Sequence, residues 1–298
     1  MKSLIRPFIV LTGALVLLAA GCATTGPQWP AITDVPTDAR IQGRWVWAEL
    51  MADNIESAKT FYSEVFGWEY DTIASENDAY TVIRTGGRPI AGMIHIAKPA
   101  EAVRSARWLP LMSVPDAAYA ASLATSGGGK VLVPPKKFKG RGTAAVIADP
   151  EGAPFGVLRS ETGDPIDEFP AYSSWFWMEL WAKDAEKMGV FYTPIGNYQL
   201  TRHEGPGDRH EIRLSASGFP RADILEIERQ DKPSTWVPYV RVKDVLKTVA
   251  IVSRAGGKIV VDPSPEIRGG KVAVFVDPQG AVVAVVEWKD ENEGEGKP

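Results

Sequence analysis

Two tryptophan–glutamate pairs are the residues of this chain best suited to bind or transform a small molecule. Trp47 and Glu49 form one pair, and Trp177 and Glu179 form the other, 130 positions later. Residues two apart on a strand face the same side, so each indole stands beside a carboxylate. The indole could stack on a flat ligand while the carboxylate accepts a hydrogen bond from it. A partly desolvated glutamate could also have a raised pKa and serve as a general base.

Structural roles for the same residues remain open at this stage. The tryptophans could simply fill the interior, with the glutamates paired to backbone N–H groups or to an arginine. His95 lies in an apolar run. Its side chain either contributes to ligand binding beside the tryptophan–glutamate pairs or belongs to the core or edge of the sheet. His203 and His210 flank a segment typical of a solvated hairpin tip, where any metal binding would be adventitious.

Most of the sequence consists of two similar halves, which indicates two copies of one fold. Besides the Trp-x-Glu-Leu runs, Phe61-Tyr62 returns as Phe191-Tyr192. Three further landmarks recur at an offset of 128: Trp108-Leu109-Pro110 as Trp236-Val237-Pro238, Gly128-Gly129-Lys130 as Gly256-Gly257-Lys258, and Asp149-Pro150-Glu151-Gly152 as Asp277-Pro278-Gln279-Gly280. A period this long means duplicated domains rather than a solenoid.

The elements expected in each copy follow the order β-α-β-β-β, twice. In the first copy, residues 45–51 alternate like a strand, and residues 55–65 carry apolar side chains at helical spacing before Gly67. Three short strands follow, and the same order begins again at Trp108. We therefore expect an α+β protein with two tandem domains, residues 43–160 and 173–288, and a frayed tail at residues 289–298.

The first 22 residues predict export. Lys2 and Arg6 precede an apolar run, Phe8 to Ala20, that is too short to be a permanent membrane span. The run ends at Cys22, the only cysteine, and it resembles a bacterial lipoprotein signal. The resemblance implies a signal peptide at residues 1–21 and a lipid on Cys22; an ordinary signal peptide would leave Cys22 a passive thiol.

A lipid at Cys22 would hold the domains on a membrane surface in the cell envelope. Because Ala23 rather than an aspartate follows the cysteine, we expect the outer membrane, facing the periplasm. Residues 22–42 would then form a lipidated tether, unless Trp29 and Pro30 dock onto the first domain. The net charge of −4 and the absence of a basic stripe argue against nucleic-acid binding. There is also no dinucleotide-binding or P-loop glycine pattern after a strand, and no local Ser-His-Asp motif.

The repeated motifs resemble the vicinal oxygen chelate superfamily, which includes glyoxalase I, extradiol dioxygenases and bleomycin-resistance proteins. The resemblance is carried by Phe61-Tyr62 with Phe66-Gly67-Trp68, by the two Asp-Pro-x-Gly turns and by the Trp-x-Glu-Leu strands. It implies that each pair of βαβββ modules curls into an open β-cup with flanking helices. Enzymes of the family place a divalent metal on the inner wall of that cup.

The resemblance also implies where metal ligands would stand. The corresponding positions here are Trp47 and Trp177, Leu109 and Val237, and Gly156 and Ala284, none of which can coordinate a metal through its side chain. The remaining position falls near His95 and Glu226, which gives one possible ligand per cup. We therefore predict that the family metal has been lost and that the protein binds no cofactor.

Two hypotheses about function follow, with a third held open. The first is a ligand-binding monomer with paired domains, whose cups hold a small aromatic or amphipathic molecule through Trp47, Glu49, His95, Trp177, Glu179 and Glu226. The alternative is a lyase, isomerase or dioxygenase of the same superfamily that uses a metal, or Glu49 or Glu179 as a general base. A protein that only contacts other envelope proteins is the third possibility.

Overall fold

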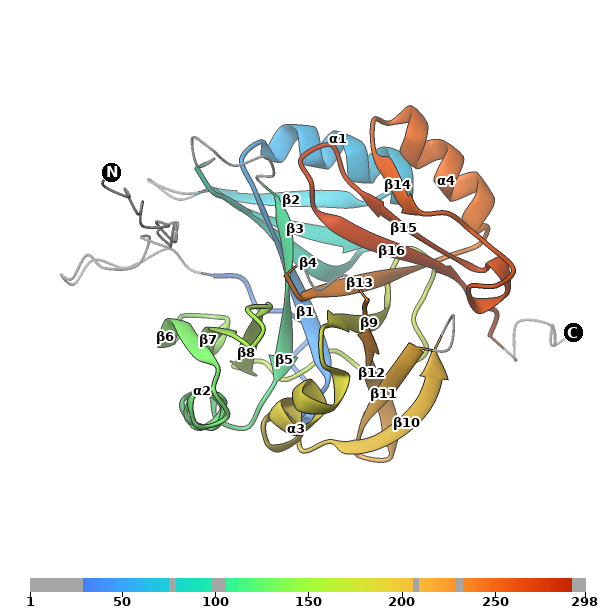
Figure 1. The fold of residues 1–298 in the computed structure, drawn as a ribbon. Coiled ribbons are helices and arrows are strands. Elements are labelled where there is room, and N and C mark those ends of the chain that lie inside the picture. The colour runs from blue at the N-terminus through green and yellow to red at the C-terminus, as the bar shows by residue number, and fades with distance from the viewer. Residues whose placement is uncertain (1–28, 75–78, 98–105, 206–208, 229–232, 291–298) are drawn as a thin grey trace, which may run out of the picture.

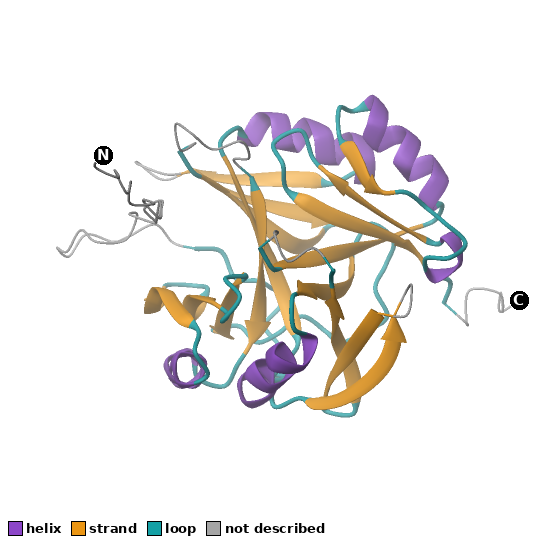
Figure 2. Cartoon of the chain, in the orientation of Figure 1, coloured by secondary structure: helices purple, strands orange, loops and turns teal. Residues whose placement is uncertain are grey.

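The computed structural model describes residues 29–74, 79–97, 106–205, 209–228 and 233–290. Within them the chain forms two eight-stranded mixed sheets, one for each repeat, flanked by helices (Figures 1 and 2). The strand orders are β2-β3-β4-β1-β5-β8-β7-β6 and β10-β11-β12-β9-β13-β16-β15-β14. The predicted α+β class and tandem arrangement are confirmed.

The element bounds follow the expected βαβββ modules closely. The first domain contains β1 (Trp45–Ala52), α1 (Ile55–Phe66), β2 (Glu69–Ala74), β3 (Ala79–Thr85), β4 (Arg88–His95), β5 (Arg107–Ser113), α2 (Ala117–Ser126), β6 (Lys130–Phe138), β7 (Gly142–Ala148) and β8 (Pro154–Ser160). The second contains β9 (Trp175–Ala182), α3 (Ala185–Gly196), β10 (Gln199–Gly205), β11 (Arg209–Ala216), β12 (Phe219–Glu226), β13 (Thr235–Val242), α4 (Val245–Arg254), β14 (Lys258–Val261), the short 3-10 turn η1 (Arg268–Gly270), β15 (Val272–Val276) and β16 (Val282–Glu287).

Helix α1 shows how local sequence sets these bounds. The side chain of Asn54 accepts a hydrogen bond from the backbone N–H of Ser57 and so caps the first turn. Gly67 ends the helix in the left-handed conformation, with φ of 70°, which glycine adopts without strain. Between these caps, Phe61 and Tyr62 lie on the buried face. The caps and the apolar spacing explain why this helix could be predicted almost to the residue.

The two domains pack back to back through their helix-bearing faces. Helix α1 lies beside α4, and α2 lies beside α3, so each helix pair joins the two domains (Figure 1). Phe155 of the first domain contacts Phe191 and Tyr192 of the second, with ring centroids 6.3 and 5.1 Å apart. Aromatic pairs at this spacing add to the apolar burial. The concave faces of both sheets therefore point away from the domain interface.

The repeated landmarks meet in two matching hydrogen-bonded triads at this interface. The Tyr62 hydroxyl donates to Asp277 Oδ2 at 3.0 Å and accepts from Trp108 Nε1 at 3.0 Å. In the mirror arrangement, the Tyr192 hydroxyl donates to Asp149 Oδ2 and accepts from Trp236 Nε1, again at 3.0 Å each. Each tyrosine thus joins the Asp-Pro-x-Gly turn of the other domain, and burial raises the pKa of Asp149 to about 6.

The described part of the predicted tether lies against the first domain. Ile32 has no exposed surface, and the backbone N–H of Thr37 donates to the Thr162 carbonyl at 2.7 Å. Asp164 accepts from the backbone N–H of Ile41 at 2.6 Å. Docking of the Trp29–Pro30 region, the alternative left open above, is therefore the arrangement observed from residue 29 onward. Residues 1–28, with the leader and Cys22, lie outside the described residues, as do residues 291–298 of the predicted tail.

Candidate functional site

Glu49 of the first cup is buried in a complete set of donors. Its carboxylate accepts from Trp47 Nε1 at 2.9 Å, from the Tyr80 hydroxyl at 2.8 Å and from Arg141 Nη1 at 2.8 Å. Burial raises the pKa of Glu49, and the charge of Arg141 opposes that rise. Pairing with an arginine is the structural role foreseen for this glutamate. Its saturated, sealed position argues against Glu49 as a general base.

Arg141 joins the first cup to the N-terminal segment. It precedes β7, and its side chain is 1% exposed. Besides its pair with Glu49, Nη2 donates to the Tyr80 hydroxyl at 2.7 Å and Nε donates to the Pro30 carbonyl at 2.6 Å. A buried guanidinium is tolerable only when its donors are satisfied in this way.

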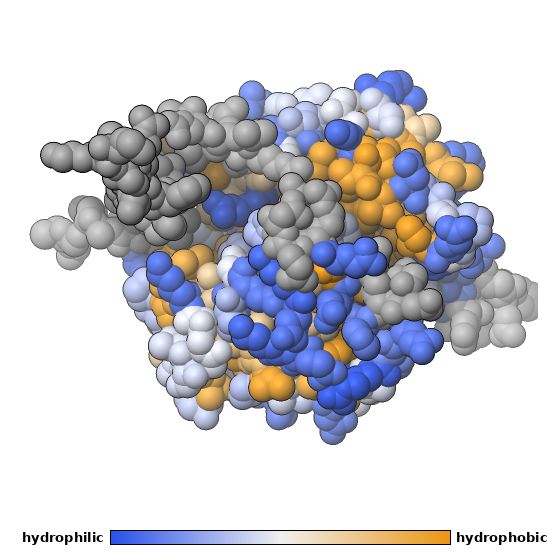
Figure 3. All heavy atoms as spheres, in the orientation of Figure 1, coloured by the Kyte–Doolittle hydropathy of each residue, from blue (hydrophilic) through white to orange (hydrophobic). Residues whose placement is uncertain are grey.

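The second cup repeats the first-strand glutamate in a different setting. Glu179 is 2% exposed and accepts from Trp181 Nε1 at 2.8 Å, from the Tyr239 hydroxyl at 2.6 Å and from Arg268 Nη2 at 2.9 Å. Trp177 and Trp181 are only half-buried. Apolar side chains gather on the visible face over β15 and β16 (Figure 3). This cup therefore combines a polar floor with apolar walls.

Two further acids share that floor, and the sequence reasoning missed both. Asp223 on β12 lies next to Glu179 in register and binds Arg213 through both carboxylate oxygens, at 2.9 and 3.2 Å. Glu211 on β11 is 4% exposed and accepts from Arg268 Nη2 at 3.1 Å. Burial, reinforced by the charge of Asp223, raises the pKa of Glu211 to about 7. An aspartate within the apolar run of β12 was the signal that could have found this site.

The acidic cluster of Glu179, Glu211 and Asp223 has the donor set of a divalent-cation site. One carboxylate oxygen from each lies within 4.8 Å of the others, and hard cations prefer such ligands. Arg268 Nη2, however, lies 2.9, 3.1 and 4.0 Å from oxygens of the three acids. A guanidinium thus stands where a cation would bind, so the residues as arranged do not fit a metal.

The six positions predicted to correspond to family ligands do lie along the cup walls. Trp47 and Leu109 belong to the apolar lining of the first cup, and Gly156 pairs with Leu111 of that lining. Trp177, Val237 and Ala284 line the second cup. These six positions therefore lie in or beside the apolar linings of the two cups, and the loss of the metal stays a prediction.

His95 and Glu226 are not in the cups, and their predicted role as ligand-binding residues there does not fit the structure. His95 is exposed at the end of β4. Glu226 ends β12 and accepts from the backbone N–H of Ala185 at the start of α3, at 3.3 Å. Each lies three residues beyond the cup-facing position, Gly92 or Asp223, and an odd separation on a strand reverses the face. His203 and His210 are exposed on the β10–β11 hairpin.

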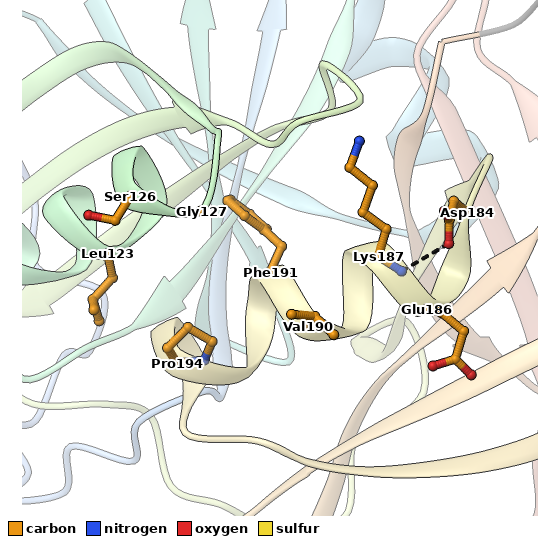
Figure 4. A pocket seen from close by; sticks show the side chains of 9 residues that line it. All are labelled: Leu123, Ser126, Gly127, Asp184, Glu186, Lys187, Val190, Phe191 and Pro194. Carbon is orange, nitrogen blue, oxygen red and sulfur yellow. Dashed lines mark hydrogen bonds between the residues drawn. The ribbon is translucent and has the colours of Figure 1, made fainter.

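A surface groove lies between α2 and α3, outside the cups. It has a volume of about 590 Å³ and is lined mainly by Leu123, Val190, Phe191 and Pro194, with Asp184, Glu186 and Lys187 at one end (Figure 4). The side chain of Asp184 caps α3 through the backbone N–H of Lys187. No buried polar group converges on this groove from the residues that Figure 4 labels, so the cups remain the better candidates.

Comparison with known proteins identifies the family of the first domain. Residues 44–157 match the model of the Glyoxalase/Bleomycin resistance protein/Dioxygenase superfamily. The chain is 25% identical to CFP32 of Mycobacterium tuberculosis (strain CDC 1551 / Oshkosh), whose name includes the word glyoxylase, over 83% of this chain and 95% of that protein. It is 26% identical to the anthracycline biosynthesis protein DauV of Streptomyces sp. (strain C5), over 83% and 94%.

The same architecture occurs in a solved enzyme. The Mn(II)-bound glyoxalase from Novosphingobium aromaticivorans superposes with a TM-score of 0.54 at 14% identity, covering 83% of this chain and 82% of that one. At this identity the likeness concerns the fold alone. Residues 44–157 therefore form a domain of the glyoxalase/bleomycin resistance/dioxygenase superfamily, and the second domain repeats the strand order of the first.

Proposed function

We propose that the second cup is the functional site and that it binds a small aromatic or amphipathic molecule without the family metal. The observation that carries this proposal is the acidic cluster held against Arg268 in an apolar cup, beside two half-buried tryptophans. The first cup, by contrast, has its polar groups sealed beneath Trp29–Ile32. The two copies therefore differ in access.

Arg268 and the tryptophans indicate the chemistry of the ligand. The Arg268 side chain is 33% exposed, and only its Nη2 binds the acids among the described residues. Its remaining donors could bind a carbonyl or carboxylate oxygen of a ligand. The indole N–H groups of Trp177 and Trp181 are engaged with Asp223 and Glu179, which leaves ring surface for stacking.

The second candidate function is an enzyme that uses a general base. The pKa of Glu211 favours this function, with Glu211 rather than Glu49 as the base. A carboxyl with a pKa of about 7 exchanges protons readily near neutral pH. A lactoylglutathione lyase assay with the wild type and Glu211→Gln would test this candidate, since a relative in Arabidopsis thaliana carries that activity in its name. If the wild type turns over the substrate and Glu211→Gln does not, catalysis rather than simple binding is the function of this cup.

We also propose that the protein is a lipoprotein held at a membrane in the bacterial cell envelope by Cys22, on the outer membrane facing the periplasm. The support is the leader sequence, with its apolar run before the single cysteine. Every helix among the described residues falls short of the length and apolar character needed to cross a membrane.

The binding proposal can be tested with 2-naphthoate as a probe in isothermal titration calorimetry. We expect Arg268→Ala to weaken binding at least about tenfold, or roughly 1.4 kcal/mol. Arg254→Ala is the matched control, because Arg254 is 68% exposed and pairs with Glu64 on the surface. Equal affinity of Arg268→Ala and the wild type would contradict the proposed site, and equal binding of cyclohexanecarboxylate would contradict the aromatic preference.

A further inference from the structure

The first cup already holds an occupant, namely the tip of the chain's own N-terminal segment, Trp29–Ile32. The Trp29 ring lies 5.1 Å from the ring of Tyr80 and 5.0 Å from that of Phe138. Ile32 is fully buried among Trp47, Leu109 and Leu158. An aromatic ring and an aliphatic group thus fill the space that an external ligand would take.

The polar part of this contact resembles ligand recognition. Arg141 uses Nη1 for Glu49 and Nη2 for Tyr80, and among the described residues its Nε donates only to the Pro30 carbonyl, at 2.6 Å. If the tip leaves, a buried donor loses its acceptor, which is unfavourable. A ligand that brings an oxygen acceptor beside an aromatic ring would restore both contacts.

The segment is fastened mainly beyond the tip. Thr33 Oγ1 bonds Thr162 Oγ1 at 2.9 Å, the Thr37 hydroxyl donates to the Asp164 carbonyl at 2.6 Å, and the Asp164 N–H donates to the Ala39 carbonyl at 2.8 Å. Within the described tip, the Pro30 carbonyl makes the one hydrogen bond found. Trp29 and Pro30 are half-buried, whereas Ile32 is fully enclosed. Trp29 and Pro30 can therefore swing out while Ile32 and residues 33–41 stay in place.

We infer that the first cup is a second ligand site, which takes an aromatic molecule carrying a carbonyl or carboxylate oxygen, and that Trp29–Pro30 competes with this ligand. The guanidinium of Arg141 receives the oxygen, and the rings of Tyr80 and Phe138 receive the aromatic group. The site is separate from the second cup, so this inference does not depend on the binding proposed there.

Calorimetry of the full chain with 2-naphthoate tests the competition by counting sites. We expect Trp29→Ala to add one binding site per chain, or to raise the affinity of the first cup about tenfold or more, because the apparent affinity scales with the open fraction. Trp29→Phe is the matched control and should stay closed, because a ring still fills the cup. Unchanged stoichiometry and affinity in Trp29→Ala would overturn the inference.

Two further variants in the Trp29→Ala background locate the added site. Arg141→Lys removes the Nε donor, and Phe138→Ala removes a half-buried ring. Either should weaken the added site several-fold, whereas Arg268→Ala should leave it intact. A thermal melt confirms that each variant is folded, and Phe138→Ala serves if Arg141→Lys does not fold. An added site that survives both changes lies elsewhere and refutes the assignment, whatever happens in the second cup.

Discussion

Replacing Tyr192 with phenylalanine would test whether the repeated landmarks hold the two domains together. The hydroxyl group of Tyr192 is fully buried; it donates to Asp149 and accepts from Trp236, both at 3.0 Å. The substitution leaves the ring and its packing against Phe155 in place. It therefore removes one hydrogen bond that crosses the interface, to Asp149, and one within the second domain, from Trp236, with little change of shape.

The expected loss of stability follows from the two groups left without a partner. Each buried polar group that loses its hydrogen bond costs about 1–3 kcal/mol, so Tyr192→Phe should cost about 2–6 kcal/mol in total. Asp149 Oδ1 keeps its bonds from the backbone N–H groups of Glu151 and Ala153, at 2.9 and 2.8 Å. The turn should therefore persist, and the loss should appear as weaker association of the domains.

The pH dependence of the loss separates this explanation from a general packing defect. Burial raises the pKa of Asp149 from 3.8 to about 6, so its contribution to stability is present below pH 3.8 and is lost as the pH rises through 6. That change amounts to about 3 kcal/mol in the wild type. The hydrogen bond from Tyr192 lowers the pKa, and its removal raises the pKa further. The substitution should therefore cost more at pH 8 than at pH 5.

Urea unfolding followed by circular dichroism at pH 5 and pH 8 gives both quantities. Tyr119→Phe is the matched control, since Tyr119 is 64% exposed on α2 and should change stability by less than about 0.5 kcal/mol. Tyr62→Phe should behave like Tyr192→Phe because it breaks the mirror triad. A loss below about 1 kcal/mol, or an equal loss at both pH values, would refute this account of the interface.

Three further outcomes are expected. Purified wild-type protein should hold no stoichiometric divalent metal by elemental analysis. Arg268→Ala, which removes the guanidinium from among the three carboxylates of the second cup, should bind one equivalent of Mn²⁺, and a metal-loaded wild type would contradict the role given to Arg268. Affinity for 2-naphthoate should fall several-fold from pH 6 to pH 8, because Glu211, with a pKa of about 7, gains negative charge, and Glu211→Gln should remove that dependence. Cys22→Ala should move the protein from the membrane to the soluble fraction of lysed cells, and retention in the membrane would argue against the lipid anchor.

The fold could be predicted because its information is local and repeated. Caps such as Asn54 and Gly67 and strand alternation fix the modules, and the duplication fixes the domain count. What the sequence could not reveal was why Tyr62, Trp108 and Asp277 recur. They meet only when the domains pack, and the partners of one triad lie as far apart as 215 positions in the chain.

The site was predicted only in part, because cup-facing residues on the first strands are easier to place than those on later strands. The two Trp-x-Glu pairs lie on the cup-facing sides of β1 and β9. His95 and Glu226 were favoured for their chemistry, although each lies three residues past the cup-facing position. The arginines that meet Glu49 and Glu179 come from turns, where no periodicity indicates the direction of a side chain. Docking of Trp29 depends on contacts more than a hundred residues away in sequence.

The difference between the cups can be traced to two pairs of matching positions. Where the second cup has Glu211 and Asp223, the first has Tyr80 and Gly92. A Cβ atom on Gly92 would lie 1.8 Å from the Tyr80 hydroxyl and 2.3 Å from Glu49 Oε2, so no larger residue fits there while Tyr80 holds Glu49. Tyr80 and Gly92 thus stand in place of two carboxylates, supply one neutral donor between them, and leave a single acid for Arg141. The charge balance of one acid with one arginine allows Glu49 and Arg141 to be fully buried beneath the N-terminal tip. Three acids around Arg268 instead favour a polar floor that keeps some contact with solvent.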